Sequence, residues 1–139
     1  MARTLLAEVV TPDGILYANE VEMVVATTTE GEIGILPLHA PVVSVLKPGE
    51  IRVKWNSLKD VEWFAVSGGY IQVHEDKVIV LADQAEIVSA IDVDRARAAV
   101  DLNRKRMDEL SAEQSDEVSA CERDLHWCEL QLELAERHK

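Results

Sequence analysis

The chain lacks several features that would place it in a familiar functional class. No apolar run among its 139 residues approaches the roughly 20 positions that cross a bilayer. The first residues show no basic segment followed by an apolar core, so we expect no signal peptide. No nucleophile stands with an identifiable base, which favours a non-enzyme. The histidines share no ligand spacing, so we expect no metal site. They are His39, His74, His126 and His138.

Positive charge is also scarce. The chain has 14 lysine and arginine residues against 26 aspartate and glutamate residues, which gives a net charge of -12. Such a surface is repelled by nucleic-acid phosphates and by anionic lipid headgroups, which argues against direct binding to either. The same surface can complement a basic protein partner.

The two cysteines, Cys121 and Cys128, do not predict a disulfide bond. They lie seven residues apart in a segment with helical periodicity. At about 1.5 Å of rise per residue, a helix holds them too far apart to bond. We interpret them as small apolar fillers in a reducing compartment.

Glycine and proline are confined to the first part of the chain. All six glycines and all four prolines lie at or before Gly69, and charged residues number 19 in positions 1–90 but 21 in positions 91–139. Because glycine and proline interrupt helices and favour turns, this shift predicts a β-rich domain over residues 1–90. It predicts a helical domain over residues 91–139.

The first 90 residues predict short strands separated by turns. We expect turns at Pro12–Gly14, Lys47–Glu50 and Glu75-Asp76, where proline, glycine or acidic residues gather. Many short antiparallel strands at this spacing predict a β-sandwich or flattened barrel. The expected strands are Leu5–Val10, Val21–Thr27, Ile51–Trp55, Val61–Val66, Tyr70–Val73 and Val78–Leu81.

Residues 91–139 predict two helices. Asp92 is a good N-cap for the first, with Ile91 and Ala96 at hydrophobic-staple spacing. The polar segment 111–117 is short enough to force a hairpin. Apolar positions recur at three- and four-residue steps on one face of each helix. These faces are Ala96, Ala99, Val100, Asn103, Met107 and Leu110, and then Val118, Cys121, Leu125, Cys128, Leu132 and Ala135. The predicted fold class is β + α: an N-terminal antiparallel β-sandwich followed by a C-terminal antiparallel two-helix hairpin.

The segment Glu30–Pro41 (EGEIGILPLHAP) has the most unusual composition. Gly31 and Gly34 permit backbone angles that other residues avoid, while its two prolines remove amide donors. We expect the apolar strip 33–36 to lie in the core between two exposed corners, as in a rigid loop that presents a surface to a partner. The alternative is an ordinary bulged strand.

Several segments together carry a resemblance to a known family. After Glu30–Pro41 come Ser67-Gly68-Gly69, then Leu81-Ala82-Asp83 with Glu86, and then Ile91–Ala96 (IDVDRA) at the start of the helices. In this combination the chain resembles the epsilon subunit of bacterial F-type ATP synthases over nearly its whole length. Ile-Asp-x-x-Arg-Ala alone would be a weak motif, because many helices begin that way.

The resemblance implies a non-catalytic subunit of the central rotor stalk that requires no cofactor. Such a subunit binds the gamma subunit, rests on the ring of membrane c subunits and couples proton-driven rotation to ATP synthesis. It lies on the cytoplasmic face of the cell membrane as a peripheral protein. The resemblance also implies that the helices can extend toward the catalytic alpha and beta subunits and inhibit ATP hydrolysis.

Glu30, Glu32 and His39 are the candidate docking residues of the sandwich. The resemblance places Glu32 and His39 where family members meet the c-ring loops and the foot of gamma. The alternative is a solvated turn whose histidine caps a backbone group.

Asp92, Arg95 and Ala96 are a candidate ATP site, because the matching family motif can hold ATP and a helix N-terminus with an arginine forms an anion site. The alternative is a local ion pair, in which Asp92 and Asp94 offset a cation that the helix dipole disfavours. Family members that bind ATP tightly carry further arginines on both helices. This chain has Leu102 where one is expected, so we expect weak regulatory binding of ATP at most.

Arg104, Lys105 and Arg106 form the one basic cluster of the sequence. By the resemblance, they can meet an acidic segment of the catalytic beta subunits. The alternative is a solvated helix face with pairs within the helix. Their partners would then be Asp101, Asp108 and Glu109.

Trp127, Leu130 and Leu134 form, with Ala120, a second apolar stripe on the last helix. We expect it to dock on the sandwich in a compact state, or on gamma and the catalytic head in a raised state. The alternative is a stripe that covers the sandwich permanently.

Two other functions of the chain stay open: a free-standing nucleotide sensor and an adaptor that shares only the fold.

Overall fold

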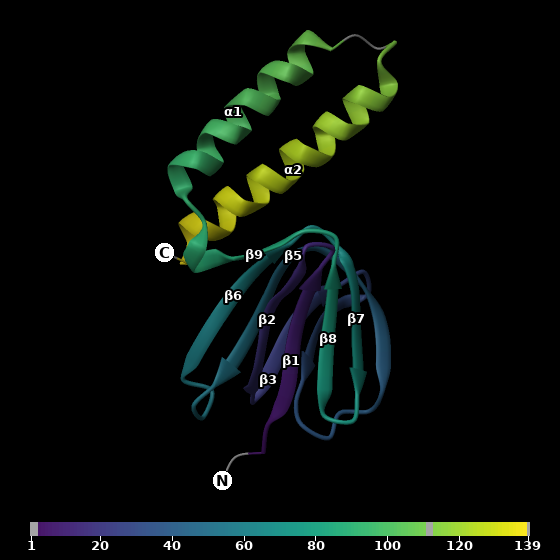
Figure 1. Ribbon diagram of the computed structural model, residues 1–139, viewed down its shortest axis with the longest axis vertical. Coiled ribbons are helices and arrows are strands. Elements are labelled where there is room, and N and C mark those ends of the chain that lie inside the picture. The colour runs from purple at the N-terminus through teal and green to yellow at the C-terminus, as the bar shows by residue number, and fades with distance from the viewer. Residues whose placement is uncertain (1–2, 111–112, 139) are drawn as a thin grey trace. The chain divides into compact units, whose positions relative to one another are not determined.

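The computed structural model describes residues 3–110 and 113–138, which belong to two compact units (Figure 1). The first unit ends at Val88 and the second begins at Ser89. The boundary expected from the sequence falls after Ala90, at the end of a short 3-10 turn, Val88–Ala90. Strands build the first unit and two helices build the second, so the predicted fold class is confirmed.

Nine strands of the described residues form one continuous hydrogen-bonded sheet, which folds into two layers. They are β1 (Leu5–Thr11), β2 (Gly14–Val21), β3 (Met23–Thr28), β4 (Gly31–Ile35), β5 (Val42–Trp55), β6 (Asp60–Val66), β7 (Gly69–His74), β8 (Lys77–Ala82) and β9 (Ala85–Ile87). One layer has the order β2-β1-β8-β7-β5 and the other has β4-β3-β5-β6-β9. Neighbours run antiparallel except β1 and β8, which are parallel. The sequence did not predict β2 or β9.

Strand β5 belongs to both layers, and the turn expected at Lys47–Glu50 is wrong. Residues up to Leu46 pair with β7, whereas residues from Gly49 onward pair with β6. Pro48 has no amide donor, and it lies between the two ladders, where none is needed. The register with β3 shifts at the same place, so the extra residues form a bulge that bends the strand.

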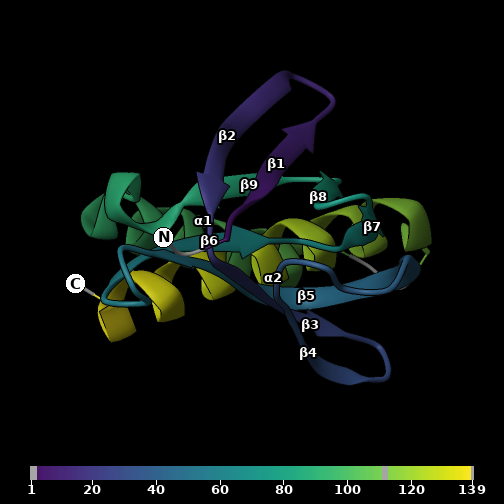
Figure 2. The same cartoon turned by 90° about the horizontal axis from the view of Figure 1, so that it is seen from below.

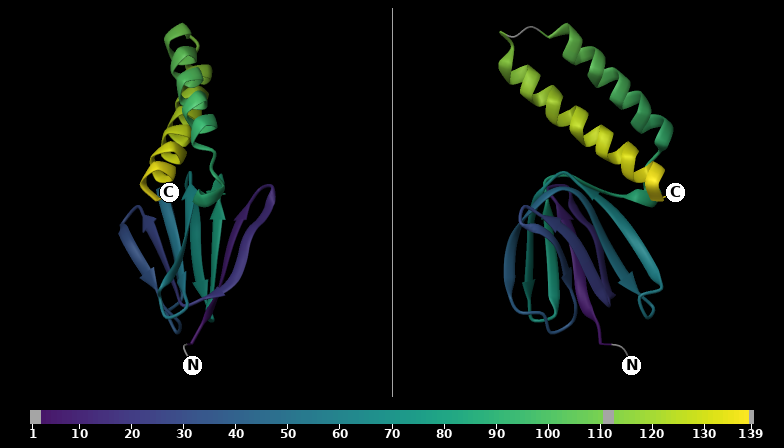
Figure 3. Two further views of the ribbon diagram at one scale, coloured as in Figure 1. Left: turned by 90° about the vertical axis from the view of Figure 1, so that its left-hand side faces the viewer. Right: turned by 180° about the vertical axis from the view of Figure 1, so that it is seen from behind.

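The core lies between the two layers and consists of alternate residues of their strands. Fully buried side chains include Val9 and Ile71 from one layer and Ile51 and Phe64 from the other. The rings of Tyr17 and Phe64 meet edge-on across the core, with centroids 5.0 Å apart. The β1–β2 and β3–β4 hairpins lie on opposite sides of the sandwich (Figures 2 and 3). Glu75 and Asp76 form the β7–β8 turn in the left-handed conformation, as expected of a tight hairpin.

The second unit is an antiparallel pair of helices, α1 (Val93–Glu109) and α2 (Ser115–His138). The carboxylate of Asp92 accepts a hydrogen bond from the Arg95 amide, so the predicted N-cap is confirmed. The predicted helix faces hold the buried residues Ala96, Val100, Asn103, Cys121, Cys128 and Ala135. Helix α2 begins at Ser115, before the end of the expected polar break, and residues 111–112 of that break lie outside the described residues. Neither described helix is long and apolar enough to cross a bilayer.

We predict that Gly69→Ala destabilises the sandwich by more than about 3 kcal/mol. Gly69 has φ 132, and an added Cβ would stand 2.0 Å from the carbonyl oxygen of Leu81, a backbone atom that cannot move aside. Gly49→Ala is the matched control, because its Cβ would meet nothing closer than 3.8 Å. Urea unfolding of the full chain, followed by circular dichroism, measures both changes. Equal unfolding midpoints for the two variants would contradict the prediction.

Candidate functional site

Strand β4 and the loop after it hold the segment 30–41. β4 is an edge strand that pairs only with β3 among the described strands. Ile33 is half-buried and Ile35 is fully buried, but Leu36 is 51% exposed. The expected core strip 33–36 therefore ends one residue early, because β4 ends at Ile35 and the chain turns away from the core.

The structure separates the three candidate docking residues of the sandwich. Glu30 precedes β4 and His39 follows it, so about 17 Å of strand lies between them at about 3.3 Å per residue. The Glu32 carboxylate lies 3.2 Å from the guanidinium of Arg52. His39 Nδ1 lies 2.7 Å from the carbonyl oxygen of Ala40, as in the backbone-cap alternative. All three candidates are exposed, but they do not form one cluster.

A tight turn over Leu36–His39 forms the tip of this loop. The His39 amide donates to the carbonyl oxygen of Leu36 at 3.2 Å. Pro37 occupies the second position, and Leu38 at the third has φ 67, where a type II turn favours glycine or asparagine. For a residue with a Cβ, this conformation costs about 1–2 kcal/mol. Leu38 is nevertheless 69% exposed.

The outer face of the β2-β1-β8-β7-β5 layer carries a row of apolar side chains that the sequence did not predict. Residues paired across strands point to the same face of a sheet. The pairs Val45↔Tyr70, Tyr70↔Leu81, Leu81↔Val10 and Val10↔Ile15 run across all five strands. Val10 is half-buried and the other four are exposed, with Ile15 at 66% and Tyr70 at 55%. We call Ile15, Val10, Leu81, Tyr70 and Val45 the apolar row.

A local signal for part of this row exists in the sequence. Val42–Leu46 is apolar at four of its five positions, although a strand with one solvated face should alternate apolar and polar residues. Val43, beside the row on the same face, is also exposed. The remaining members are single apolar residues on separate strands, and only the strand register brings them together.

The residues of the candidate ATP motif differ in their contacts and in their exposure. The Asp92 carboxylate is used as the N-cap, and Ala96 is buried. Arg95 is exposed, and among the described residues it makes no side-chain ion pair with Asp92 or Asp94. The expected local pair of Arg95 is therefore wrong in detail, because Arg97 rather than Arg95 approaches Asp94, at 3.7 Å.

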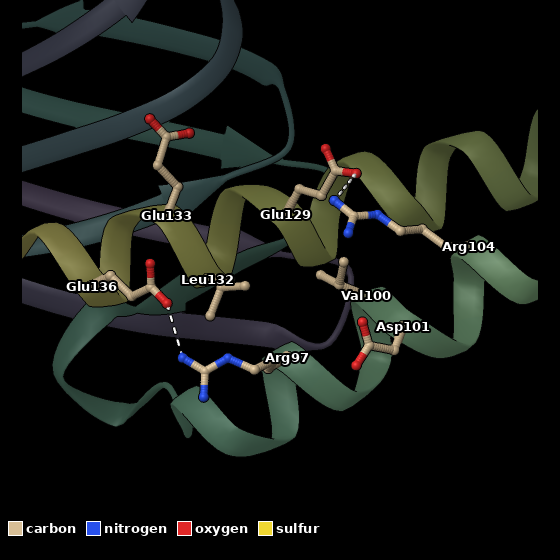
Figure 4. Close-up of a pocket in the computed structure, with 8 residues that line it drawn as sticks. All are labelled: Arg97, Val100, Asp101, Arg104, Glu129, Leu132, Glu133 and Glu136. Atoms are coloured by element: carbon tan, nitrogen blue, oxygen red, sulfur yellow. Dashed lines mark hydrogen bonds and ion pairs between the residues drawn. The ribbon is translucent and has the colours of Figure 1, made fainter.

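A groove of about 550 Å³ runs between α1 and α2, and none of the three motif residues lines it (Figure 4). Its lining is acidic. Both of its arginines are already paired, Arg97 with Glu136 at 3.1 Å and Arg104 with Glu129 at 3.7 Å. The other lining residues are Val100, Asp101, Leu132 and Glu133. An excess of carboxylates opposes the binding of a phosphate group.

The two arginines of the basic cluster form ion pairs between the helices. Arg104 reaches Glu129, and Arg106 lies 3.8 Å from Asp124, both on α2. The alternative that placed the partners of these two arginines within α1 is therefore wrong, because the antiparallel packing brings α2 carboxylates to this face. Lys105 is exposed. Of the second stripe of α2, Trp127 and Leu130 are half-buried and Leu134 is buried.

Two thiols and one amide lie in the seam between the helices. Cys121 and Cys128 are both free and buried. The Cys121 thiol donates to the main-chain oxygen of Asn103 at 3.3 Å, and the Asn103 amide donates to the Ala99 carbonyl oxygen at 2.9 Å. Burial raises the pKa of the Cys128 thiol, which lowers its thiolate fraction at neutral pH. No group of three metal-ligating side chains occurs among the described residues.

We predict that alkylation of these thiols reports opening of the hairpin. Asp92→Ala removes the N-cap of α1, which costs about 1 kcal/mol and raises the open population about fivefold. Maleimide should then label Cys121 and Cys128 about fivefold faster, as measured by mass spectrometry. Asp92→Asn keeps a capping oxygen and should label close to the unaltered rate. Equal rates for Asp92→Ala and Asp92→Asn would contradict the role of the cap.

Comparisons with known proteins agree with one another. Residues 4–88 match the family described as the ATP synthase delta/epsilon chain, β-sandwich domain. The ATP synthase epsilon chain of Alkalihalophilus pseudofirmus is 50% identical over 104 residues, covering 75% of this chain and 77% of that one. That of Halalkalibacterium halodurans is 47% identical over 113 residues, covering 81% and 84%.

Two solved structures share the fold at low identity. A chain in the mitochondrial ATP synthase of Euglena gracilis (OSCP/F1/c-ring) has a TM-score of 0.65 and 21% identity, over 96% of this chain and 78% of that one. A chain in the central stalk and c-ring of the Tetrahymena thermophila mitochondrial ATP synthase has a TM-score of 0.57 and 17% identity, over 96% and 97%.

Proposed function

The chain belongs to the ATP synthase epsilon chain family, and from this premise we propose that its sandwich docks on the gamma subunit through the apolar row. The family resemblance found in the sequence is confirmed. The chain is a non-catalytic subunit of ATP synthase, a membrane-associated complex. We place it on the cytoplasmic face of the membrane, in the central stalk, between gamma and the ring of c subunits.

The apolar row is the observation that carries the gamma interface. Each large apolar side chain left in water forgoes about 1.5–3 kcal/mol of burial free energy. In a chain of net charge -12, a row of such side chains across one face of a sheet is typical of a protein interface. The row lies on a rigid sheet, so docking orders few side chains and costs little conformational entropy.

The c ring meets a different part of the sandwich in this proposal. Glu30, Glu32 and His39 are exposed along the segment 30–41, and both carboxylates can attract basic loops of the ring. Glu32 is partly committed to Arg52, so ring binding must compete with an exposed pair that is worth about 1 kcal/mol or less. Docking at two surfaces of one rigid unit lets the sandwich transmit rotation from the ring to gamma.

The hairpin is the regulatory part in this proposal. For Arg104 and Arg106 to meet an acidic segment of the catalytic subunits, their pairs with Glu129 and Asp124 must break. These pairs are exposed, so breaking them costs about 1 kcal/mol or less each. Trp127, Leu130 and Leu134 provide the apolar contact of the extended state. In this way the helices inhibit ATP hydrolysis when they extend.

Replacing Val45 with aspartate tests the gamma interface. A charge at the β5 end of the apolar row should weaken gamma affinity about tenfold or more, because it removes apolar contact and buries a carboxylate. Val61→Asp is the matched control, since Val61 is a similarly exposed strand valine on the other layer. Titration calorimetry with purified gamma measures both affinities. If the Val45→Asp chain binds gamma as tightly as the Val61→Asp chain, the proposed gamma interface is wrong.

The proposal gives nucleotide binding only a minor role. The acidic groove and the capping role of Asp92 favour weak or undetectable ATP binding by the isolated chain, so a nucleotide sensor is the less favoured alternative. Arg95→Ala should therefore change the unfolding midpoint of the hairpin more than any affinity for ATP. Calorimetry with ATP and thermal unfolding measure the two effects. Micromolar ATP binding that Arg95→Ala abolishes would reverse this order and promote the sensor function.

A further inference from the structure

Asn103 is a polar residue in the otherwise apolar seam between α1 and α2. Among the described residues of the hairpin it is the one buried residue that is polar, with 8% of its surface exposed. A buried polar side chain is costly unless its donors and acceptors are paired. The packing of the hairpin therefore depends on whether α2 brings partners to this residue.

The hydrogen-bonding groups of Asn103 are paired in the closed hairpin, and α2 supplies part of that pairing. The side-chain amide donates to the carbonyl oxygen of Ala99 at 2.9 Å and to the sulfur of Cys128 at 3.6 Å. Its Oδ1 accepts from Arg106 at 3.3 Å, and its main-chain oxygen accepts from the Cys121 thiol at 3.3 Å. Ala99 and Arg106 belong to α1 itself, so the two thiols are the partners that depend on how α2 packs.

Helix α2 has a second face that offers Asn103 no acceptor. At 100° per residue, Trp127, Leu130 and Leu134 lie nearly opposite the thiols, and Arg123 lies on the same side. Both faces carry large apolar side chains, so apolar area alone does not choose between them. The polar groups of the second face, the indole of Trp127 and the guanidinium of Arg123, are donors only. Packed on that face, the amide donor that now meets Cys128 would be left without a partner.

The ion pairs between the helices contribute less to this choice. The pairs of Arg97 with Glu136 and of Arg104 with Glu129 join partly exposed side chains. Exposed pairs contribute little to stability, whereas a buried donor without an acceptor is more costly. Asn103 is therefore the group that separates the two packings most strongly.

We propose that Asn103 selects the face of α2 that packs on α1, with the thiols of Cys121 and Cys128 as its counterparts. A polar residue in an apolar helix seam can specify how the helices pair, at some cost in stability. The selected packing keeps Trp127 and Leu130 out of the seam. Selection operates within the isolated chain, so it needs neither gamma, nor the ring, nor a nucleotide.

The experiment compares Asn103→Leu with the matched control Met107→Leu. Met107 is half-buried on the same face of α1, and its replacement leaves Asn103 in place. Urea unfolding of each full chain is followed by the circular dichroism of the helices, and maleimide labels the native chain. Asn103→Leu should keep or raise the urea midpoint, because an apolar group replaces a buried polar one. It should nevertheless label Cys121 and Cys128 about tenfold faster than the control does, because the second packing turns the thiols away from α1.

Nuclear Overhauser contacts identify the packed face directly. Val100 and Leu132 line the same groove between the helices, so their methyl groups should be in contact in the unaltered chain (Figure 4). Asn103→Leu should add contacts from Val100 to Leu130 or Leu134. Met107→Leu should add none.

The alternatives to face selection give different combinations of results. A lower urea midpoint with faster labelling means that Asn103 only stabilises the hairpin, and slower labelling means that it only weakens the seam. Either result overturns the proposal, and so does an Asn103→Leu chain whose Val100 contacts stay on the Leu132 face. Asn103→Val has a smaller side chain and is judged by the same criteria if leucine overfills the seam. Because gamma and the ring are absent from every measurement, these outcomes leave the proposed docking of the sandwich unaffected.

Discussion

The continuity of β5 is the constraint on which the sandwich depends. This one strand pairs with β7 through its first half and with β3 and β6 through its second, so both layers take their register from it. Its bend lies where Pro48 needs no hydrogen-bond partner. The outward-facing Val45 of the first half joins the apolar row, and Arg52 of the second half joins the carboxylates of Glu32 and Glu50. One strand therefore positions an apolar surface on one layer and a charged cluster on the other.

Each of the two units is stabilised by a different kind of internal contact. The sandwich buries large aliphatic and aromatic side chains between its layers. The hairpin seam instead contains small side chains, two thiols and the amide of Asn103. Small side chains bury less area per contact, so we expect the hairpin seam to open at lower cost than the sandwich. That difference suits a rigid unit that docks and a second unit that changes state, which are the roles proposed for them.

In this proposal, charge mainly affects how fast partners associate, and apolar contact mainly determines affinity. A net charge of -12 can speed the approach of basic partners, but screened surface charges contribute little affinity. Affinity is better supplied by apolar side chains on rigid backbone, such as those of the apolar row. The groove between the helices illustrates how little its cations can contribute to affinity. Arg97 and Arg104 already pair with carboxylates, which leaves the groove acidic.

The sequence by itself determined the fold class, most strands, the N-cap Asp92 and the apolar face of each helix. These depend on local periodicity and on turn or cap chemistry, which neighbouring residues carry. The turn predicted at Lys47–Glu50 was wrong, because a Pro-Gly pair suits a turn and a bulge equally well until the partner strands are known. Only the tertiary structure decided that Ile15, Val10, Leu81, Tyr70 and Val45 form one row. It also decided that Arg104 and Arg106 pair with α2, and that the Leu38 amide is bound by Asp76. Each of these joins residues far apart in the chain, and strand register and helix packing are set by the whole core rather than by any local segment.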